Sequence, residues 1–533
     1  MAVFKRRWFM WDFARQRRFD RGEFDIVATK LRDLGFNGIG LYLEGAFELK
    51  SIGGGVLREG IMTCEDAKWV KEKCKTLGLD VFPMTNVVGH MEHFLRQERF
   101  SHLCTDGSLY NMDFTLPQAK EFAMKIVNDY IEAFDTDYIH LGGDEVSLTP
   151  ENRPLYAKFL SGICDDLLAR GITPAIWNDM LWNHKELCEP FSREVEIFDW
   201  FYYGHRPQSI KYFKEQGFKT VIPCASDNSW NGFAPHQYIR PWVADEDHTP
   251  VTADEFEAFL SDEIGIEDPD NLMGLHTHWE DTMGRDLWGQ WTMFARSGLY
   301  MAGKFNKETD TYEDLERAVF GRVTPYTEVI HIIQEEIHSL LLHPCHGIKL
   351  RDLVFNKNGY TGLLKDMERE RDGIAAEVDA PISKMTALLD GWKAENEFEE
   401  KCRAYLVAMV ALIKAAFGTY GAFDARKTLY TEAARLQFEE PQKAKELLIE
   451  FADGFSRAAE LVREYIPAQK AFIDLVPTHT DTDFVKLNRT AGYNDNMASI
   501  LKEYAEEASF KRIPLPTLSC IVHQALNGGV IER

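Results

Sequence analysis

The sequence predicts an α/β fold: a (β/α)8 TIM barrel over residues 1–305, followed by an all-α C-terminal domain over residues 306–533. Two observations support this prediction. Before residue 305, eight short strand-like segments alternate with amphipathic helical segments, which is typical of a closed parallel barrel. After residue 305, strand-like segments almost vanish and long amphipathic helices follow one another.

The eight predicted strands are short, mainly apolar runs. They cover residues 8–13, 38–43, 80–85, 138–141, 173–177, 195–200, 220–224 and 273–277. Helices with apolar residues at i, i+3, i+4 and i+7 are expected at residues 24–34, 65–77, 118–134 and 155–169. Gly35, Gly78 and Gly171 follow three of them, as is common at helix C-termini. The connection after the seventh strand, residues 226–269, is long, and loops of this length are often functional.

The C-terminal domain is predicted from its helical periodicity. Its expected helices cover residues 312–320, 329–342, 382–392, 401–417, 444–465 and 496–505. In the fifth, an apolar stripe indicates core packing rather than a cofactor site. The domain also offers a surface for a homodimer, which is a common arrangement.

Composition excludes several classes of partner. A net charge of −25 repels phosphate backbones and anionic lipid, so we expect neither nucleic acid nor a membrane as partner. Nine scattered cysteines without a Cys-x-x-Cys pair argue against a disulfide framework and a structural zinc site, and no cofactor is expected. The chain shows no signal peptide and no run of about 18 apolar residues, which predicts a cytoplasmic protein.

Polar or aromatic side chains follow every predicted strand. They are Asp12 and Arg15, Glu44, Asn86 and His90, Asp144 and Glu145, Trp177 and Asp179, Trp200, Asp227, and His278, Trp279 and Glu280. In a (β/α)8 barrel the C-terminal strand ends converge on one face, where active sites lie. A polar residue at one strand end carries little information, but their presence at all eight indicates a site.

The segment from His140 to Glu145, His-Leu-Gly-Gly-Asp-Glu, is the most informative motif. Two adjacent carboxylates repel each other, so one tends to hold a proton near neutral pH. A paired acid and base is what hydrolysis of a glycosidic bond requires. The alternative is a solvated turn that caps the next helix. Its place at the fourth of eight strand ends favours the catalytic interpretation.

This motif resembles the His-x-Gly-Gly-Asp-Glu signature of glycoside hydrolase family 20, the β-N-acetylhexosaminidases. Other features of residues 5–300 follow in the family's order: the segment from Trp11 to Arg15 after strand one, Gly89-His90 after strand three, Trp177, Trp200, and Trp279-Glu280 after strand eight. The six-residue signature is specific, whereas the other matches have weight only as an ordered set. Many members also carry a small N-terminal α/β domain, which is not expected here because the first predicted strand begins at residue 8.

The resemblance implies an exo-acting, retaining enzyme that uses substrate-assisted catalysis, a known exception to the two-carboxylate scheme. Its partner would be an oligosaccharide or glycoconjugate with a terminal β-N-acetylhexosamine. The substrate's acetamide oxygen would attack the anomeric carbon. Asp144 would orient the acetamide and stabilise its positive charge. Glu145 would protonate the leaving oxygen and then deprotonate water.

The same resemblance implies roles for other strand-end residues. Arg15 would hold sugar hydroxyls, although it could also be a surface charge. Trp177, Trp200 and Trp279 would wall a pocket for the acetamide methyl and the sugar face, although a single tryptophan is more often core. Glu280 would accept a hydrogen bond from a sugar hydroxyl, although it could also be a solvated loop carboxylate. His90 would hydrogen-bond Glu145 or an intervening acid and tune its pKa, although it could also be a structural histidine.

Two departures from the family pattern are visible. The tyrosine expected near the end of strand seven is absent, and the region that includes Asp227 has no tyrosine before Tyr238. Tyr238 or Trp230 from the long loop would have to supply the missing contact to the acetamide oxygen. Strand two ends in Glu44 where many members have a His and an Asp, so Glu44 is the proposed substitute.

Three rival hypotheses remain. His276-x-His278, with His90 and His93, would suit a metal-dependent barrel hydrolase, although barrel amidohydrolases carry their His-x-His on strand one. A catalytically inactive sugar-binding barrel is the second, against which the intact Asp144-Glu145 pair argues. The third is an ordinary glycosidase whose second carboxylate attacks the sugar directly.

Overall fold

The computed structural model describes most of the chain. The described residues are 3–15, 17–55, 60–105, 108–200, 207–226, 272–280, 286–306, 309–337, 374–476, 482–506 and 514–526. By its packing the chain divides into two compact units. One comprises Met1–Trp230, His236–Asp281 and Gln290–Val323, and the other comprises Asn231–Pro235, Thr282–Gly289 and Thr324–Arg533.

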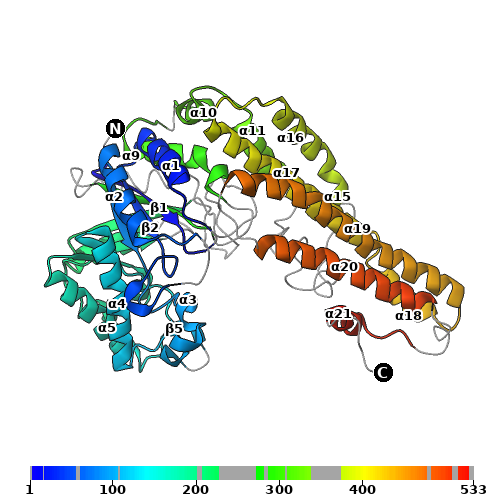
Figure 1. Ribbon diagram of the computed structural model, residues 1–533, viewed down its shortest axis with the longest axis horizontal. Coiled ribbons are helices and arrows are strands. Elements are labelled where there is room, and N and C mark those ends of the chain that lie inside the picture. Colours follow the sequence, from blue (N-terminus) through cyan, green and yellow to red (C-terminus); the bar gives the residue numbers. More distant parts are fainter. Residues whose placement is uncertain are drawn as a thin grey trace. The chain divides into compact units, whose positions relative to one another are not determined.

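The first unit is a closed barrel of eight parallel strands (Figure 1). The strands are β1 (Arg6–Asp12), β2 (Gly38–Tyr42), β3 (Asp80–Met84), β6 (Tyr138–His140), β7 (Thr173–Trp177), β8 (Glu196–Trp200), β9 (Val221–Ser226) and β10 (Met273–His278). Each pairs with its neighbours in chain order, and β1 closes the ring against β10. The predicted fold class is confirmed, and each predicted strand lies within about two residues of an observed one.

Side chains that alternate along the strands fill the barrel. On β10, Leu275 and, just past its end, Trp279 belong to the interior cluster. Between them in the alternation, His276 and His278 contact Phe294 of helix α9 (Trp291–Met301) on the outside. This two-residue period is what a strand dictates. It separates residues that face the barrel core from residues that face the helical layer.

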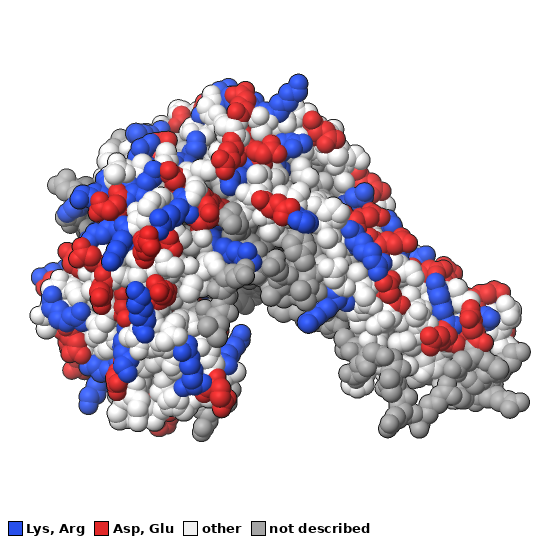
Figure 2. Space-filling model, viewed as in Figure 1, with Lys and Arg blue, Asp and Glu red and all other residues white. Residues whose placement is uncertain are grey.

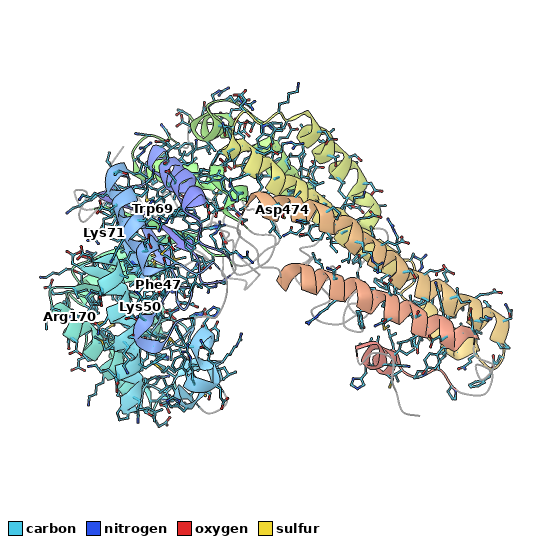
Figure 3. The ribbon with its side chains drawn as sticks, viewed as in Figure 1. Phe47, Lys50, Trp69, Lys71, Arg170 and Asp474 are labelled. Carbon is cyan, nitrogen blue, oxygen red and sulfur yellow. The ribbon has the colours of Figure 1, made fainter. Side chains whose placement is uncertain are left out.

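Helices surround the barrel between successive strands (Figure 1). They are α1 (Arg21–Asp33), α2 (Cys64–Leu77), α4 (Pro117–Phe134), α5 (Arg153–Leu168), α7 (Pro207–Glu215) and α9. Thr63 and Asp66 form a capping box that starts α2, and Gly78 ends it at φ 69°. In Figure 3, Phe47 lies beside this layer, where it stacks on Tyr130 of α4 at 4.8 Å.

A small insertion follows β3 and was not predicted. It contains α3 (Glu92–Leu95), a 3-10 turn (Glu98–Leu103) and an antiparallel hairpin of β4 (Cys104–Thr105) and β5 (Ser108–Met112). The insertion is anchored by backbone bonds from Met91 to Tyr110 and from Met112 to Val88. These bonds tie the hairpin to the end of β3, so β5 lies beside the strand ends that the motif occupies.

The helix α10 (Tyr312–Phe320) packs against α9 and groups with the barrel unit. The sequence instead assigns this segment to the C-terminal domain, because it follows the last strand and has helical periodicity. The two units therefore differ from the 305/306 division: this helix groups with the barrel, whereas Asn231–Pro235 and Thr282–Gly289 group with the helical unit. The 305/306 boundary between two separate domains stays a prediction.

The second unit is helical (Figure 1). Its described helices are α11 (Tyr326–Ile332), a π-helical turn (Ile333–Ile337), α15 (Ile374–Glu377), α16 (Asp379–Gly391), α17 (Glu397–Asp424), α18 (Leu429–Leu436), α19 (Pro441–Leu475), α20 (Thr482–Glu506) and α21 (Leu518–Leu526). α19 packs along both α17 and α20. The apolar stripe predicted for α19, including Leu448, Phe451 and Phe455, is buried as core.

The observed α19 is longer than the predicted helix of residues 444–465. A proline disfavours a helix interior, so the sequence ends the helix before Pro467. The structure continues it through Pro467 to Leu475, and Gln469 and Phe472 beyond the proline are buried. Burial of these side chains offsets the local cost of the proline.

The segment Glu397–Leu436 is the one candidate for a membrane span among the described helices. Its most apolar window has a mean hydropathy of 1.7, and 72% of that window is buried inside the protein. Burial of this kind is what the core helix of a helical bundle shows.

Candidate active site

The segments that follow β2, β3, β6 and β7 place five acidic or imidazole groups close together: Glu44, His90, Asp144, Glu145 and Asp179. Three glycines make this approach possible. A Cβ on Gly142, whose φ is +71°, would lie 1.5 Å from Asn86 Oδ1, and one on Gly143, at φ +91°, would lie 2.8 Å from a Leu160 methyl. A Cβ on Gly89 would lie 2.5 Å from the Asp144 carbonyl oxygen. Only glycine fits these positions, so the motif's glycines serve close packing.

His90 bridges the two motif carboxylates. Its Nε2 lies 3.3 Å from Asp144 Oδ2 and 3.4 Å from Glu145 Oε2. Burial by itself lowers the pKa of His90, but the nearby carboxylates, Asp144 first, outweigh that effect and raise it to about 11. The ring therefore carries both protons at neutral pH. The predicted contact of His90 with this pair is present in the structure.

The two motif carboxylates differ in exposure. Asp144 is buried, whereas the Glu145 side chain is 56% exposed. Burial raises the pKa of Asp144, but the charge and hydrogen bond of His90 outweigh it and hold that pKa below its usual value. Asp144 Oδ1 has no hydrogen-bond partner among the described residues. Asp144 is thus an ionised carboxylate with one oxygen open, and Glu145 is its solvent-facing neighbour.

Backbone strain concentrates at this site. Glu44, His90 and Glu145 have φ values of 43°, 50° and 50°, in the left-handed region that residues with a Cβ rarely adopt. Each such residue costs on the order of 1–3 kcal/mol and persists only where its surroundings hold it. Strain at three strand ends that meet at one place is typical of a functional site.

The first motif residue, His140, supports the site from beneath. Its Nδ1 accepts the Gly142 N–H at 3.1 Å, and its ring meets the edge of Trp177 at 4.4 Å. Burial lowers the pKa of His140 to about 3, so the ring is neutral. A neutral ring whose Nδ1 accepts must carry its proton on Nε2, which fixes the tautomer.

Asp179, just past β7, was among the predicted strand-end residues, but no role was predicted for it. Its Oδ2 accepts the backbone N–H of Glu145 at 2.8 Å. Burial first, and the charge of Asp144 second, raise the pKa of Asp179 to about 8. Because adjacent carboxylates repel each other, the sequence predicts a proton within the Asp144-Glu145 pair. In the structure, the pKa of a third carboxyl, that of Asp179, is raised. Its position directly after a strand was the only sequence signal.

Tyr110 is a second residue that the sequence did not reveal. Its hydroxyl lies 2.5 Å from His90 Nε2 and donates to Glu145 Oε2 at 3.4 Å. Because His90 carries both protons, its Nε2–H donates to Tyr110, which in turn donates to Glu145. No sequence signal could have found Tyr110, since it lies on the hairpin that was not predicted.

Glu44 is buried in a network of its own. Its Oε1 accepts from the Tyr42 hydroxyl at 2.7 Å and from Asn86 Nδ2 at 3.2 Å, and its Oε2 lies 3.3 Å from His93 Nε2. Burial, the largest influence, raises the pKa of Glu44. Both oxygens are already engaged, so the structure shows Glu44 holding the ends of β2 and β3 together. Direct sugar contact stays a prediction.

Arg15 lies at the end of β1 against aromatic rings. Its guanidinium is 4.8 Å from the Trp279 ring centroid and 5.0 Å from that of Tyr42, and Nη1 lies 3.2 Å from Asp12 Oδ2. Asp12 Oδ2 also accepts the Glu280 backbone N–H at 3.0 Å. Arg15 therefore contacts residues of the barrel interior at the ends of the strands, and does not belong to a surface cluster of arginines.

The three predicted tryptophans come together. Trp177 and Trp279 belong to the barrel's interior cluster with ring centroids 6.1 Å apart, and Trp200 packs against the same cluster. Trp177 is only 1% exposed, so it forms the floor beneath the motif. Trp200 is partly exposed at the end of β8.

Glu280 occupies a different environment from the predicted one. Both of its oxygens lie within hydrogen-bond distance of Arg17 Nε, at 2.9 and 3.1 Å, and Arg17 also pairs with Glu23 of α1 at 3.0 Å. His278 Nε2 lies 3.3 Å from Glu280 Oε1. Glu280 is thus part of a buried ion cluster between β10 and α1. A hydrogen bond from a sugar hydroxyl to Glu280 stays a prediction.

Three predicted substrate-binding residues, Asp227, Trp230 and Tyr238, lie outside the described residues.

The rival metal hypothesis needs His276 as a metal ligand. In the structure, His276 Nδ1 lies 2.8 Å from Ser297 Oγ and the ring stacks on Phe9, on the outside of the barrel. Within the ranges that the structure describes, no three His, Cys, Asp or Glu side chains are grouped as metal ligands.

The fold and the site together define a (β/α)8 barrel with a histidine-bridged carboxylate pair at its strand ends. No family model matches the chain. The chain is similar to the lacto-N-biosidase of Bifidobacterium bifidum, with 25% identity over 173 residues that cover 28% of this chain and 15% of that protein. The match therefore spans a small part of that relative's length.

Several solved structures are similar to this one. A β-N-acetylhexosaminidase from Bacteroides fragilis NCTC 9343 has a TM-score of 0.42 and 18% identity, covering 56% of this chain and 66% of that chain. The family 20 β-N-acetylhexosaminidase from Streptomyces coelicolor A3(2) has a TM-score of 0.46 and 14% identity, covering 60% and 70%. The family 20 enzyme from Vibrio harveyi has a TM-score of 0.45 and 17% identity, covering 60% and 57%. Two of the three are named as members of the family that the His140–Glu145 motif resembles.

The ionised His90-Asp144 pair predicts a pH-dependent stability. The raised pKa of His90 stabilises the fold fully below its ordinary value of 6.5, and this contribution is lost as pH rises towards about 11. The lowered pKa of Asp144 contributes above its ordinary value of 3.8 and is lost as pH falls. Urea unfolding should therefore show the largest difference between the wild type and His90→Gln between these ordinary values, with the difference shrinking as pH rises above 6.5.

The control for this prediction is His102→Gln, because His102 is an exposed histidine in the insertion after β3. It should show no comparable change with pH. A constant difference between the wild type and His90→Gln from pH 6 to pH 9 would contradict the ion pair.

Proposed function

We propose that the chain is a retaining, exo-acting β-N-acetylhexosaminidase that uses substrate-assisted catalysis. One observation supports this most directly: a buried, ionised Asp144 with an open oxygen stands beside a solvent-facing Glu145, and His90 bridges them. Membership of glycoside hydrolase family 20 is part of the proposal. The motif and the names of the similar structures support it.

The proposed first step uses the substrate's own acetamide. Its carbonyl oxygen forms a bond to the anomeric carbon while the glycosidic C–O bond breaks, and the leaving oxygen takes the proton of Glu145. Asp144 Oδ1 accepts the acetamide N–H and balances the positive charge that develops on the resulting oxazolinium ring. A charge held in a buried place stabilises an adjacent cation far more than one in water.

The second step returns the site to its starting state. Glu145 takes a proton from water as the water oxygen bonds to the anomeric carbon, and the ring opens to restore the acetamide. Two displacements at one carbon retain its configuration. Tyr110 and His90 donate towards the Glu145 carboxylate in the interval when it is ionised.

The remaining roles follow from position. Arg15, fixed between Tyr42 and Trp279, is placed to meet neighbouring sugar hydroxyls with its fork of donors. Acidic and basic side chains are interspersed on the face shown in Figure 2, which suits a neutral sugar rather than a polyanion. The proposed partner is an oligosaccharide or glycoconjugate that ends in a β-N-acetylhexosamine, and a homodimer stays a proposal.

The test is a panel of aryl β-glycosides: N-acetylglucosaminide, N-acetylgalactosaminide, glucosaminide and galactoside. Release is expected from one or both acetamido sugars, and not from the matched glucosaminide, because that sugar lacks the attacking oxygen. An aryl lacto-N-bioside belongs in the panel because of the similarity to lacto-N-biosidase. Failure to cleave either acetamido sugar would sink the proposal.

Further outcomes separate the rival hypotheses. Loss of activity with a chelator would favour a metal-dependent hydrolase. A trapped covalent sugar–protein adduct would favour direct attack by a carboxylate. Sugar binding without turnover of any panel member would favour an inactive sugar-binding barrel.

A further inference from the structure

Asp179 differs from the other carboxyls of the site in what surrounds it. Oδ2 accepts the Glu145 backbone N–H at 2.8 Å, and Oδ1 is buried without a hydrogen-bond partner among the described residues. Asp144 also has one open buried oxygen, but it has a cation, His90, 3.3 Å away. No ion pair to Asp179 is found within the described part of the chain. A negative charge on Asp179 therefore costs more free energy than a negative charge on Asp144.

The Glu145 backbone needs the bond that Asp179 supplies. At φ 50° this residue is in the left-handed region, where a residue with a Cβ is strained and persists only if its surroundings hold it. The N–H that Asp179 holds belongs to Glu145 itself, so the bond sets the direction in which the Glu145 side chain leaves the motif. Asp179 follows β7, a strand adjacent to β6 in the barrel, which makes the anchor rigid.

We propose that Asp179 is the positioning residue of this carboxyl cluster: one oxygen holds Glu145 in its strained turn, and the carboxyl group carries a proton of its own, so that Asp144 stays ionised. The proposal rests on the proposed function for its kinetic consequences, whereas the location of the proton does not depend on it. A neutral acid still accepts through its carbonyl oxygen, so the two parts of the role are compatible.

The groups that face Asp179 come from three elements. The loop after β6 contributes Asp144 and Glu145, and the negative charge of Asp144 disfavours a second charge on Asp179. The N–H groups of Glu145 and Met180 favour the ionised form, and Tyr156 of α5 is a neutral neighbour. Burial and the charge of Asp144 dominate, and raise the pKa of Asp179 to about 8.

The test uses the full chain and two substitutions of similar size. Asp179→Asn keeps an acceptor for the Glu145 N–H and is neutral at every pH, as the protonated acid is. It should keep kcat within about tenfold of the wild type at pH 6. Asp179→Leu removes the acceptor and should lower kcat about 100-fold while KM stays within about threefold, because a mis-set catalytic group slows chemistry without removing sugar contacts.

The proton is located by infrared spectroscopy, without any substrate. The spectrum of the wild type at pH 6 minus that of Asp179→Asn should contain the C=O stretch of one protonated carboxyl group, and this difference band should weaken by pH 9. The control is Asp166→Asn, since Asp166 is exposed on α5 and paired with Lys120, and it should leave the band unchanged.

Two results would overturn the proposal: no protonated-carboxyl band in the difference between the wild type and Asp179→Asn at pH 6, or equal loss of kcat in the Asn and Leu variants. If Asp179→Leu fails to fold, the Asn variant and its spectrum still decide. If no glycoside is cleaved at all, the proposed function fails, but the infrared comparison still tests the proton on Asp179.

Discussion

Glu145→Gln should lower kcat by about 10²- to 10⁴-fold on a β-linked N-acetylglucosamine disaccharide, the range that a positioned general acid contributes. A sugar leaving group must be protonated as it departs, and glutamine has no proton to give. The loss should be much smaller with a dinitrophenyl glycoside, because that leaving group departs without protonation. The measurement is kcat for both substrates in both proteins.

The solvent exposure of Glu145 makes this substitution a clean probe. Its side chain is 56% exposed and its backbone is held by Asp179, so the amide should fit without disturbing the fold. Glu121→Gln, at an exposed position on α4, is the matched control and should leave both rates unchanged. An equal loss with both leaving groups would show that Glu145 is not the acid.

Asp144→Asn should lower kcat by about 10²- to 10³-fold, the effect of removing one preorganised group that meets developing charge. A neutral amide cannot balance the oxazolinium ion, and it leaves the His90 imidazolium without its main partner. An inhibitor that carries the fused five-membered ring of this ion should lose affinity by a similar factor. Both quantities can be measured on the same preparation.

The leaving group distinguishes Asp144 from Glu145. Because Asp144 acts on the acetamide, Asp144→Asn should lower kcat by the same factor with a dinitrophenyl glycoside as with a disaccharide. Asp33→Asn, on the exposed end of α1, is the control. Unchanged affinity for the fused-ring inhibitor, or near-full kcat, would show that Asp144 has another role.

Much of the fold could be predicted from the sequence because its signals are local. Strand and helix periods lie within about ten residues of chain, and eight alternating units are compatible with few architectures other than a barrel. The motif was visible for the same reason, since His140 to Glu145 are contiguous. The prediction for α19 was wrong beyond Pro467 because the packing that keeps the helix intact comes from distant helices.

The side chains of the helical layer illustrate the same limit. In Figure 3, Lys71 of α2 is labelled; it pairs with Asp135, just past α4, at 2.5 Å. Nothing near Lys71 in sequence indicates that partner. Likewise, Arg17 was one of several arginines after β1, and only the folded barrel brings its guanidinium to Glu280, 263 residues later.

The sequence predicts the barrel, the helical segment after it and the Asp144-Glu145 pair at the fourth strand end. The folded structure is needed to see that Asp144 is ionised, that the pKa of Asp179 is raised and which residues contact the pair. The physical reason is that charge states depend on burial and on neighbours a few ångströms away. Here those neighbours come from two separate connections: His90 and Tyr110 lie in the insertion after β3, and Asp179 follows β7.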